Sequence, residues 1–301
     1  MKKSYLLIVL AAFLWGCIGI FYKQLSSMGF SSMQIVAIRC TVAAICMVLF
    51  LLFANPAGLR IRLRDCWYFV GTGIFSLVFF NWCYFSAMEF SSLGVAAVLL
   101  YTSPIFVMVL SAIFFGEKIT LFKSIALVLT LAGCVLVAGI LGDTSSRISL
   151  IGVLLGVGSG LGYALYSIFG RVALKKYSSM TVTTYTFIFA AFCALPLSGL
   201  HHSLALFASP GAFWSSLGLG VLCCALPFLF YTIGLQHIET GKAAILATLE
   251  PAVATVIGVA FYGETLSWIK LTGIGLIFLS ILLLNMSQAS AGRSFSLHKS
   301  L

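Results

Sequence analysis

The sequence is poor in charge. Asp, Glu, Lys and Arg together make up 8% of its 301 residues, whereas soluble domains carry roughly 25%. Apolar residues make up 61% of the chain, so most of the folded surface cannot face water. This composition excludes an ordinary soluble protein and predicts one that crosses a membrane several times.

Long polar segments are also missing. The longest polar stretches, 55–65, 142–149 and 201–211, are too short for a soluble catalytic or regulatory domain. A helix needs about 20 mostly apolar residues to cross a bilayer core of about 30 Å. The apolar runs therefore predict ten transmembrane helices, at 4–22, 32–53, 66–87, 92–115, 122–141, 149–171, 181–200, 213–236, 241–262 and 267–286.

Motifs for metals, nucleotides and catalysis are absent from the sequence. None of the nine cysteines shows the two-residue spacing of a zinc or redox site, so no metal and no cofactor are expected. The glycines of 156–162 resemble a dinucleotide fingerprint but fall inside a predicted helix. Gly152, Gly156 and Gly160 instead predict a close helix-packing face. Without a HExxH motif, paired intramembrane aspartates or a plausible Ser-His pair, no enzyme is expected. Without a nucleotide motif, ATP is not the direct energy source.

The sequence does contain an internal duplication. Residues 240–267 repeat the design of residues 93–120 at an offset of 147, with Pro251 for Pro104 and Glu264 for Glu117. Five helices per half is an odd number, so the second half must enter the membrane from the opposite side. The predicted fold is all-α, with ten transmembrane helices arranged as two inverted five-helix repeats. The repeats are expected at 1–147 and 148–290, followed by a cytoplasmic tail at 291–301.

Basic residues are distributed unevenly between the predicted loops. If the N-terminus is cytoplasmic, thirteen of the seventeen Lys and Arg residues fall on the cytoplasmic side, and only Lys23, Arg147 and Lys270 fall on the other. Cytoplasmic loops are enriched in Lys and Arg. Both termini are therefore expected in the cytoplasm and the protein in the inner (cytoplasmic) membrane. The net charge of +10 follows from this topology and does not require a nucleic-acid partner.

A carboxylate stands directly before the second of the paired prolines. Glu250 lies eight residues past Lys242, about 12 Å along the helix axis from its cytoplasmic end. An ionised side chain at that depth must face a cavity, pair with a cation or be protonated. Two interpretations stay open: a proton-carrying or cation-binding carboxylate, or a helix-packing hydrogen bond beside Pro251. Its counterpart in the first half is Ser103, so Glu250 breaks the symmetry.

Three further residues are candidates for gating. Arg39 lies about 10 Å inside the second predicted helix and needs a partner there. That partner is a substrate carboxylate, Glu89 or a helix C-terminus, and a structural or gating role is favoured. Pro104 and Pro251 each remove a backbone hydrogen bond at equivalent points of the two halves. They are expected to kink gating helices, a static kink being the alternative.

Aromatic and polar residues gather on predicted helices 1, 3, 4, 6 and 8. Asn81 and Tyr84 share a face of helix 3 that Phe228 and Tyr231 repeat in helix 8. Because lipid penalises unpaired hydroxyls and amides, such side chains are expected to line a wet cavity, although packing is the simpler explanation for any one of them. The expected substrate or cavity residues are Trp15, Asn81, Tyr84, Tyr101, Ser103, Tyr163, Tyr166, Tyr231 and Glu250.

A series of motifs runs along the chain in a fixed order. They are Leu14-Trp15-Gly16 with Lys23, Ile38-Arg39, Leu93 to Pro104 with Gly116-Glu117, and the second copy through Pro251 and Gly263-Glu264. In these motifs the sequence resembles a known family, the EamA branch of the drug/metabolite transporter superfamily. The resemblance covers nearly the whole chain and implies ten helices, alternating access, a central cavity lined by helices 1, 3, 4, 6, 8 and 9, and export of amino acids or related metabolites.

The sequence therefore predicts a secondary transporter that moves a small metabolite, such as an amino acid, outward. Proton-coupled exchange through Glu250 is one mechanism. Multidrug or quaternary-cation efflux, or facilitated transport, is the alternative, and a non-transporting scaffold is a distant one. The expected partners are a small-molecule substrate, the lipid bilayer and, as a candidate coupling ion, the proton; a homodimer is compatible with the sequence. Substrate, direction, coupling ion and oligomeric state stay open.

Overall fold

The computed structural model describes residues 2–140 and 149–297, with side chains in 3–140 and 149–284. All regular structure in these residues is helical, which confirms the predicted helical membrane protein. Nine of the described helical segments are long and apolar enough to cross a membrane, and a shorter apolar helix follows at Trp268–Leu284. The nine are Lys3–Ser27, Ser32–Ala54, Leu63–Phe90, Leu93–Phe115, Leu121–Ala138, Leu150–Ala173, Ser179–Ser198, Pro210–Leu235 and Thr240–Tyr262.

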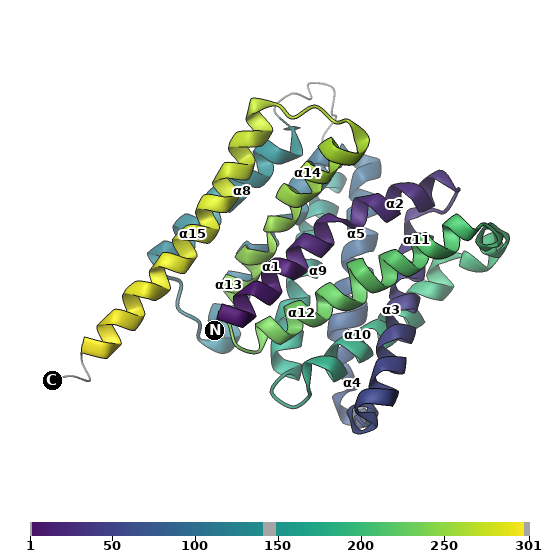
Figure 1. Cartoon of the computed structure of the whole chain (residues 1–301), viewed down its shortest axis with the longest axis horizontal. Coiled ribbons are helices and arrows are strands. Elements are labelled where there is room, and N and C mark those ends of the chain that lie inside the picture. The colour runs from purple at the N-terminus through teal and green to yellow at the C-terminus, as the bar shows by residue number, and fades with distance from the viewer. Residues whose placement is uncertain (1, 141–148, 298–301) are drawn as a thin grey trace.

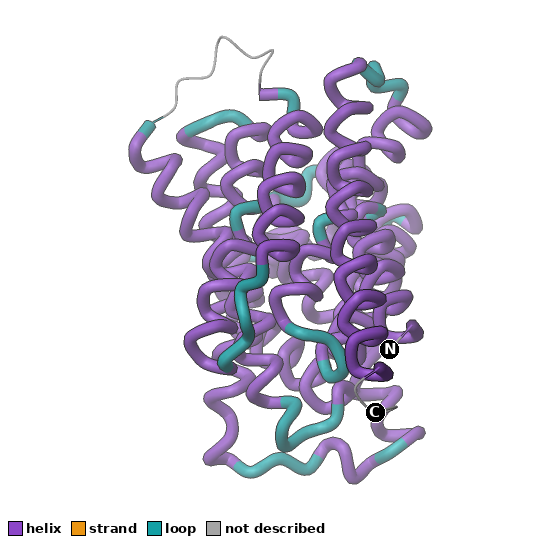
Figure 2. Tube along the Cα trace, turned by 90° about the vertical axis from the view of Figure 1, so that its left-hand side faces the viewer, coloured by secondary structure: helices purple, strands orange, loops and turns teal. Residues whose placement is uncertain are grey.

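The helices form one bundle whose members run between two ends (Figures 1 and 2). The first span consists of α1 (Lys2–Gly16) and α2 (Ile18–Ser27). We call the end of the bundle where α1 begins the near end, and the end where α2 finishes the far end. The near end is the side that the charge distribution predicts to be cytoplasmic.

The fourth and ninth spans are each broken in the middle. Proline lacks an N–H donor and its ring collides with the preceding turn. The breaks fall one turn before Pro104 and Pro251, at Tyr101-Thr102 and at Thr248. The predicted kinks are thus interruptions of the helix. The resulting four helices are α6 (Leu93–Leu100), α7 (Ser103–Phe115), α13 (Thr240–Ala247) and α14 (Leu249–Tyr262).

The third and eighth spans each contain a stretch of π-helix, whose wider turns shift the side chains that follow. The two stretches are Val70–Val78 and Val221–Ala225. Periodicity alone gave no sign of either. The α-helical parts of these spans are α4 (Cys66–Phe69), α5 (Phe79–Phe90), α11 (Pro210–Gly220) and α12 (Leu226–Leu235).

The remaining long helices pack in pairs. Helix α3 packs on α10, α8 on α15, α5 on α9, and α1 on α12, and α7 contacts α13. The predicted glycine face of α9 is confirmed: a Cβ at Gly160 would lie 2.9 Å from the carbonyl oxygen of Leu99, so only glycine permits this approach. The bounds are α3 Ser32–Ala54, α8 Leu121–Ala138, α9 Leu150–Ala173, α10 Ser179–Ser198 and α15 Trp268–Leu297.

Candidate functional site

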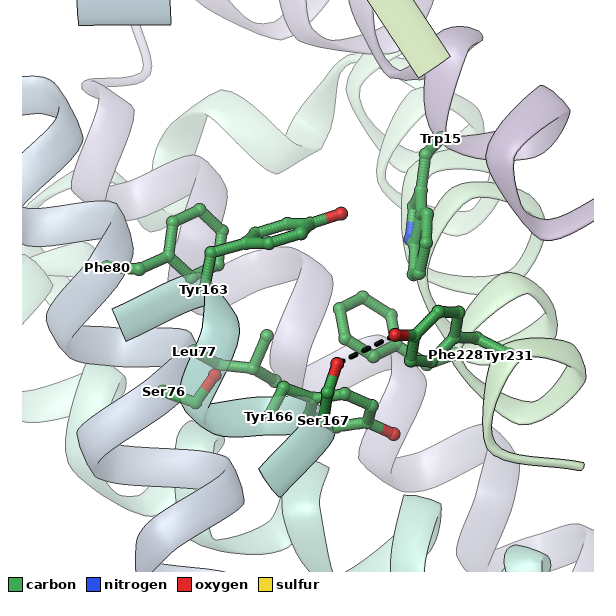
Figure 3. A pocket seen from close by; sticks show the side chains of 9 residues that line it. All are labelled: Trp15, Ser76, Leu77, Phe80, Tyr163, Tyr166, Ser167, Phe228 and Tyr231. Atoms are coloured by element: carbon green, nitrogen blue, oxygen red, sulfur yellow. Dashed lines mark hydrogen bonds between the residues drawn. The ribbon is translucent and has the colours of Figure 1, made fainter. Parts of the chain in front are cut away.

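A small aromatic cavity lies at the centre of the bundle. Its volume of ≈ 10 Å³ is at the lower limit for one water molecule, so a metabolite enters only if the helices move. Rings from α1, α9 and α12 close it: Trp15 and Phe228 meet edge to face at 5.0 Å between centroids, and Tyr166 and Phe228 at 4.9 Å. The lining residues in Figure 3 are Trp15, Ser76, Leu77, Phe80, Tyr163, Tyr166, Ser167, Phe228 and Tyr231.

Two of the predicted tyrosines form hydrogen bonds within the wall. The hydroxyl of Tyr231 shares a 2.7 Å hydrogen bond with Ser167, drawn dashed in Figure 3. The hydroxyl of Tyr166 lies 2.6 Å from that of Thr232 on α12. These two hydroxyls therefore tie α9 to α12.

Two other polar groups of the cavity are buried without a partner among the described residues. They are the indole nitrogen of Trp15 and the hydroxyl of Ser76, whose residues are 5% and 0% exposed. Figure 3 shows the indole nitrogen on the edge of Trp15 that faces Tyr163. A buried donor without an acceptor costs roughly 1–3 kcal/mol. Both groups are thus available to a ligand.

The negative charge of the site belongs to Glu250. It stands in the first turn of α14, where the helix N-terminus favours an anion. Tyr163 donates a hydrogen bond of 3.3 Å to its Oε2 atom. Tyr84 and Tyr101 lie within electrostatic range of the same carboxylate. Of the predicted tyrosines, Tyr163 thus contacts Glu250 directly.

The positive charge belongs to Arg39 on α3, which is 9% exposed. Its Nη2 atom donates to Oδ1 of Asn81 at 2.8 Å, and Asn81 in turn donates to the carbonyl oxygen of Leu77 at 2.6 Å. Its Nε atom has no partner, and within the described residues no carboxylate forms an ion pair with it. A guanidinium has five N–H donors. Arg39 therefore retains unused capacity for an anion.

The two opposite charges act on the same region. The field of Arg39 reaches both Glu250 and Tyr163, although the two charged groups are not in contact. Asn81, predicted to line the cavity, accepts a hydrogen bond from Arg39 through its Oδ1 atom. Neither Glu89 nor a helix C-terminus, two of the partners predicted for Arg39, appears among its described contacts, and a substrate carboxylate stays a prediction.

The other predicted residues lie at the breaks of the fourth and ninth spans. Tyr101 is part of the first break, and Ser103 is the buried first residue of α7. Pro104 and Pro251 each follow a break. Gly16 at the end of α1 approaches α14 so closely that a Cβ there would lie 3.0 Å from the carbonyl oxygen of Glu250.

The list of expected cavity residues omitted five residues of the wall, although Phe228 had been placed on an aromatic face of helix 8. The five are Ser76, Leu77, Phe80, Ser167 and Phe228. Ser167 is one helical turn beyond Tyr163, so its face of α9 was readable from the sequence. Ser76 and Leu77 lie in the π-helical stretch, where α-helical spacing gives the wrong face.

The family model described as "EamA-like transporter family" matches residues 2–139 and 150–286. A protein of Archaeoglobus fulgidus named "uncharacterized transporter" is 29% identical over 92% of this chain and 94% of its own length. The threonine/homoserine exporter RhtA of Escherichia coli K12 is 31% identical over 65% of this chain and 64% of its own.

A solved crystal structure has the same fold. It matches with a TM-score of 0.80 and covers 95% of this chain and 97% of its own, at 18% identity.

Proposed function

Because the chain belongs to the EamA-like transporter family, we propose that it is a secondary transporter of the cell membrane that exports a small zwitterionic metabolite, such as an amino acid, by alternating access. The observation that carries this proposal is the pair of opposite charges, Arg39 and Glu250, beside an aromatic cavity with unpaired donors. The name of RhtA, an exporter of threonine and homoserine, points to the same class of substrate. Neither the family nor these relatives are named as enzymes.

The proposed mechanism requires two inverted repeats, 1–147 and 148–290, with both termini in the cytoplasm. Three features that recur at the 147-residue offset support it: the breaks at Tyr101 and Thr248, the left-handed glycines Gly116 and Gly263, and the π-helical stretches. The helix packing also supports the inverted repeats. The 147-residue offset makes α9 the equivalent of α1, α12 that of α5 and α14 that of α7; α1 packs on α12 and α14, and α9 packs on α5 and α7. The junction at 141–148 lies outside the described residues.

In the proposed binding mode the two charges recognise the two ends of a zwitterion. Arg39 receives the carboxylate, to which a guanidinium donates well-matched hydrogen bonds. Glu250, with Tyr163 beside it, receives the ammonium group, and Trp15 supplies one more donor. When no substrate is bound, a proton on Glu250 neutralises the carboxylate, which couples export to proton exchange.

Ligand binding to two charge-neutral variants tests this assignment. Arg39→Gln is expected to weaken threonine binding by roughly 10- to 100-fold, the effect of losing a hydrogen bond to a charged group. It should leave binding of the decarboxylated amine of threonine unchanged. Glu250→Gln should weaken the binding of threonine and of its decarboxylated amine alike, because both ligands carry the ammonium group. Thermal shift of the purified protein reports each affinity.

Arg60→Gln is the matched control for these two variants, since Arg60 is exposed just after α3 at the near end. Equal loss of threonine and amine binding in Arg39→Gln would contradict the proposed binding mode.

The second candidate function is efflux of organic cations. The aromatic lining favours it, because aromatic faces attract quaternary ammonium groups, and Glu250 supplies a negative charge. Such a ligand has no carboxylate for Arg39. Stabilisation of the protein by quaternary amines, together with none by amino acids, would select this function instead.

A further inference from the structure

The near end is tied together by a carboxylate from one half that caps a helix of the other. Glu117 follows α7, and its two oxygens accept hydrogen bonds from the backbone N–H groups of Thr240 at 2.7 Å and Gly241 at 3.1 Å. These are the first two residues of α13, whose own N-cap residue, Glu239, makes no side-chain cap. An anion at a helix N-terminus is favoured by both hydrogen bonds and the helix dipole. Glu117 therefore latches the end of α7 to the start of α13.

The equivalent residue at the far end makes no such contact. Glu264 lies 147 residues after Glu117 and follows Gly263, whose φ of 65° matches the 66° of Gly116. The backbones agree further: the N–H of Glu264 donates to Gly258 at 3.2 Å, as that of Glu117 donates to the equivalent Ser111 at 3.3 Å. The side chains of Glu117 and Glu264, however, point in different directions relative to their own helices.

The carboxylate of Glu264 folds back over its own helix. It lies 3.4 Å from Lys23 and 3.7 Å from Lys270, and is 43% exposed. The helix that it would cap by symmetry is α6, at Leu93 and Gly94. That helix is capped by Ser92 instead, whose hydroxyl accepts from the N–H of Val95 at 3.3 Å.

Other contacts at the near end also join the two halves. Lys123 pairs with Glu239 across the halves at 3.2 Å, whereas its equivalent Lys270 pairs with Glu264 inside its own half. Asp65 pairs with Lys176 at 2.5 Å, and the hydroxyl of Tyr185 donates to the carbonyl oxygen of Leu59 at 2.6 Å. The far end lacks these three contacts at the equivalent positions; there the described halves are joined instead by Glu264 with Lys23 and by the hydroxyl of Tyr262, which donates to the carbonyl oxygen of Ile20 at 3.3 Å.

We propose that Glu117 and Glu264 are reciprocal latches, and that only one is engaged at a time. The described conformation has Glu117 engaged. When Glu117 releases α13, the inverted halves exchange shapes, and Glu264 engages the N-terminus of α6 at Leu93 and Gly94 to close the far end. The inference rests on the proposed alternating-access function. In it, Glu117 and Glu264 determine which end of the bundle is open.

Hydrogen exchange measured by mass spectrometry tests the latches on the full-length protein in proteoliposomes without any substrate. Glu117→Gln weakens the cap, so exchange at Thr240 and Gly241 should rise on the order of tenfold, as expected when a bond to a charged group is lost. At the same time exchange at Leu93 and Gly94 should slow, because the second latch becomes populated. Glu264→Gln should do the opposite at both helices.

Controls separate this inference from a purely structural cap. Glu117→Asp, one methylene shorter, should act in the same direction as Glu117→Gln. Glu89→Gln, an exposed carboxylate at the far end, should change neither helix. Faster exchange at α13 with no slowing at α6 would overturn the reciprocal latch. Threonine transport measured in parallel reports separately on the proposed function, because the exchange readout needs no substrate.

Discussion

The two charged residues of the site have no charged counterparts in the repeat. The 147-residue offset places Ser103 opposite Glu250, Thr186 opposite Arg39, and Phe228 opposite Asn81. Thr186 is occupied by a 2.6 Å hydrogen bond to Thr72. The symmetric residues thus build the scaffold, and the asymmetric ones carry the charges that a substrate would meet.

Gly16 gives a stability prediction at the scale of one residue. A Cβ there would lie 2.6 Å from the Cβ of Val253 and 3.0 Å from the carbonyl oxygen of Glu250. Gly16→Ala must push α1 away from α14, and overpacking of this kind costs about 1–3 kcal/mol. Thermal unfolding in detergent should show a Tm lower by several degrees.

Gly19→Ala is the control for Gly16→Ala, because a Cβ at Gly19 meets nothing within 4 Å. Equal Tm values for the two variants would show that the α1–α14 contact is loose.

At the scale of elements, the sequence predicted most of the helices but only two of their interruptions. The span limits were readable because bilayer thickness fixes helix length. Pro104 and Pro251 marked two breaks, since proline has a defined local effect. The break at Cys17 has no such cause: the chain there makes only a tight turn, with the N–H of Cys17 donating to Leu14 at 3.2 Å. Helix–helix packing decides that conformation.

Some of the site residues could also be predicted from the sequence alone. Aromatic and charged side chains inside apolar helices identified Trp15, Tyr163 and Glu250 as candidates. The contact between Arg39 and Asn81 joins helices 42 residues apart in the chain, and no periodicity encodes it. It depends on how α3 meets α5 in three dimensions.

The ion cluster between α8 and α13 gives a pH prediction. Burial raises the pKa of Glu239, but the hydrogen bond from Lys242 and the charge of Lys123 outweigh it, so that the pKa is lowered from its usual 4.5. A lowered folded-state pKa stabilises the protein above pH 4.5, and this contribution is lost as the pH falls through the lowered value. Glu239→Gln should therefore reduce the Tm at pH 7 by about 2 °C, a small effect because Glu239 is half-exposed.

Melting curves at several pH values test that prediction. The Tm difference between wild type and Glu239→Gln should be constant between pH 5.5 and 7 and shrink below pH 4.5. Lys23→Gln serves as the control at the far end. A difference that does not shrink as the pH falls below 4.5 would contradict the role of the Glu239 charge.

At the scale of the whole molecule, the structure combines a nearly closed cavity with one latched end. The central cavity of ≈ 10 Å³ and the Glu117 cap belong to a conformation in which a metabolite cannot cross from the near end. In the proposed alternating-access mechanism the two halves exchange shapes, and the proposed role of Arg39 and Glu250 is to hold the zwitterion during that exchange.

Counterflow of threonine tests the central claim most directly. Proteoliposomes containing the purified protein are loaded with unlabelled threonine, and the entry of labelled threonine is followed. The account predicts transient accumulation above that in protein-free liposomes, suppressed more strongly by homoserine than by the decarboxylated amine, and strongly reduced in Arg39→Gln. No counterflow with threonine or any other amino acid, in protein that is folded and inserted, would contradict it.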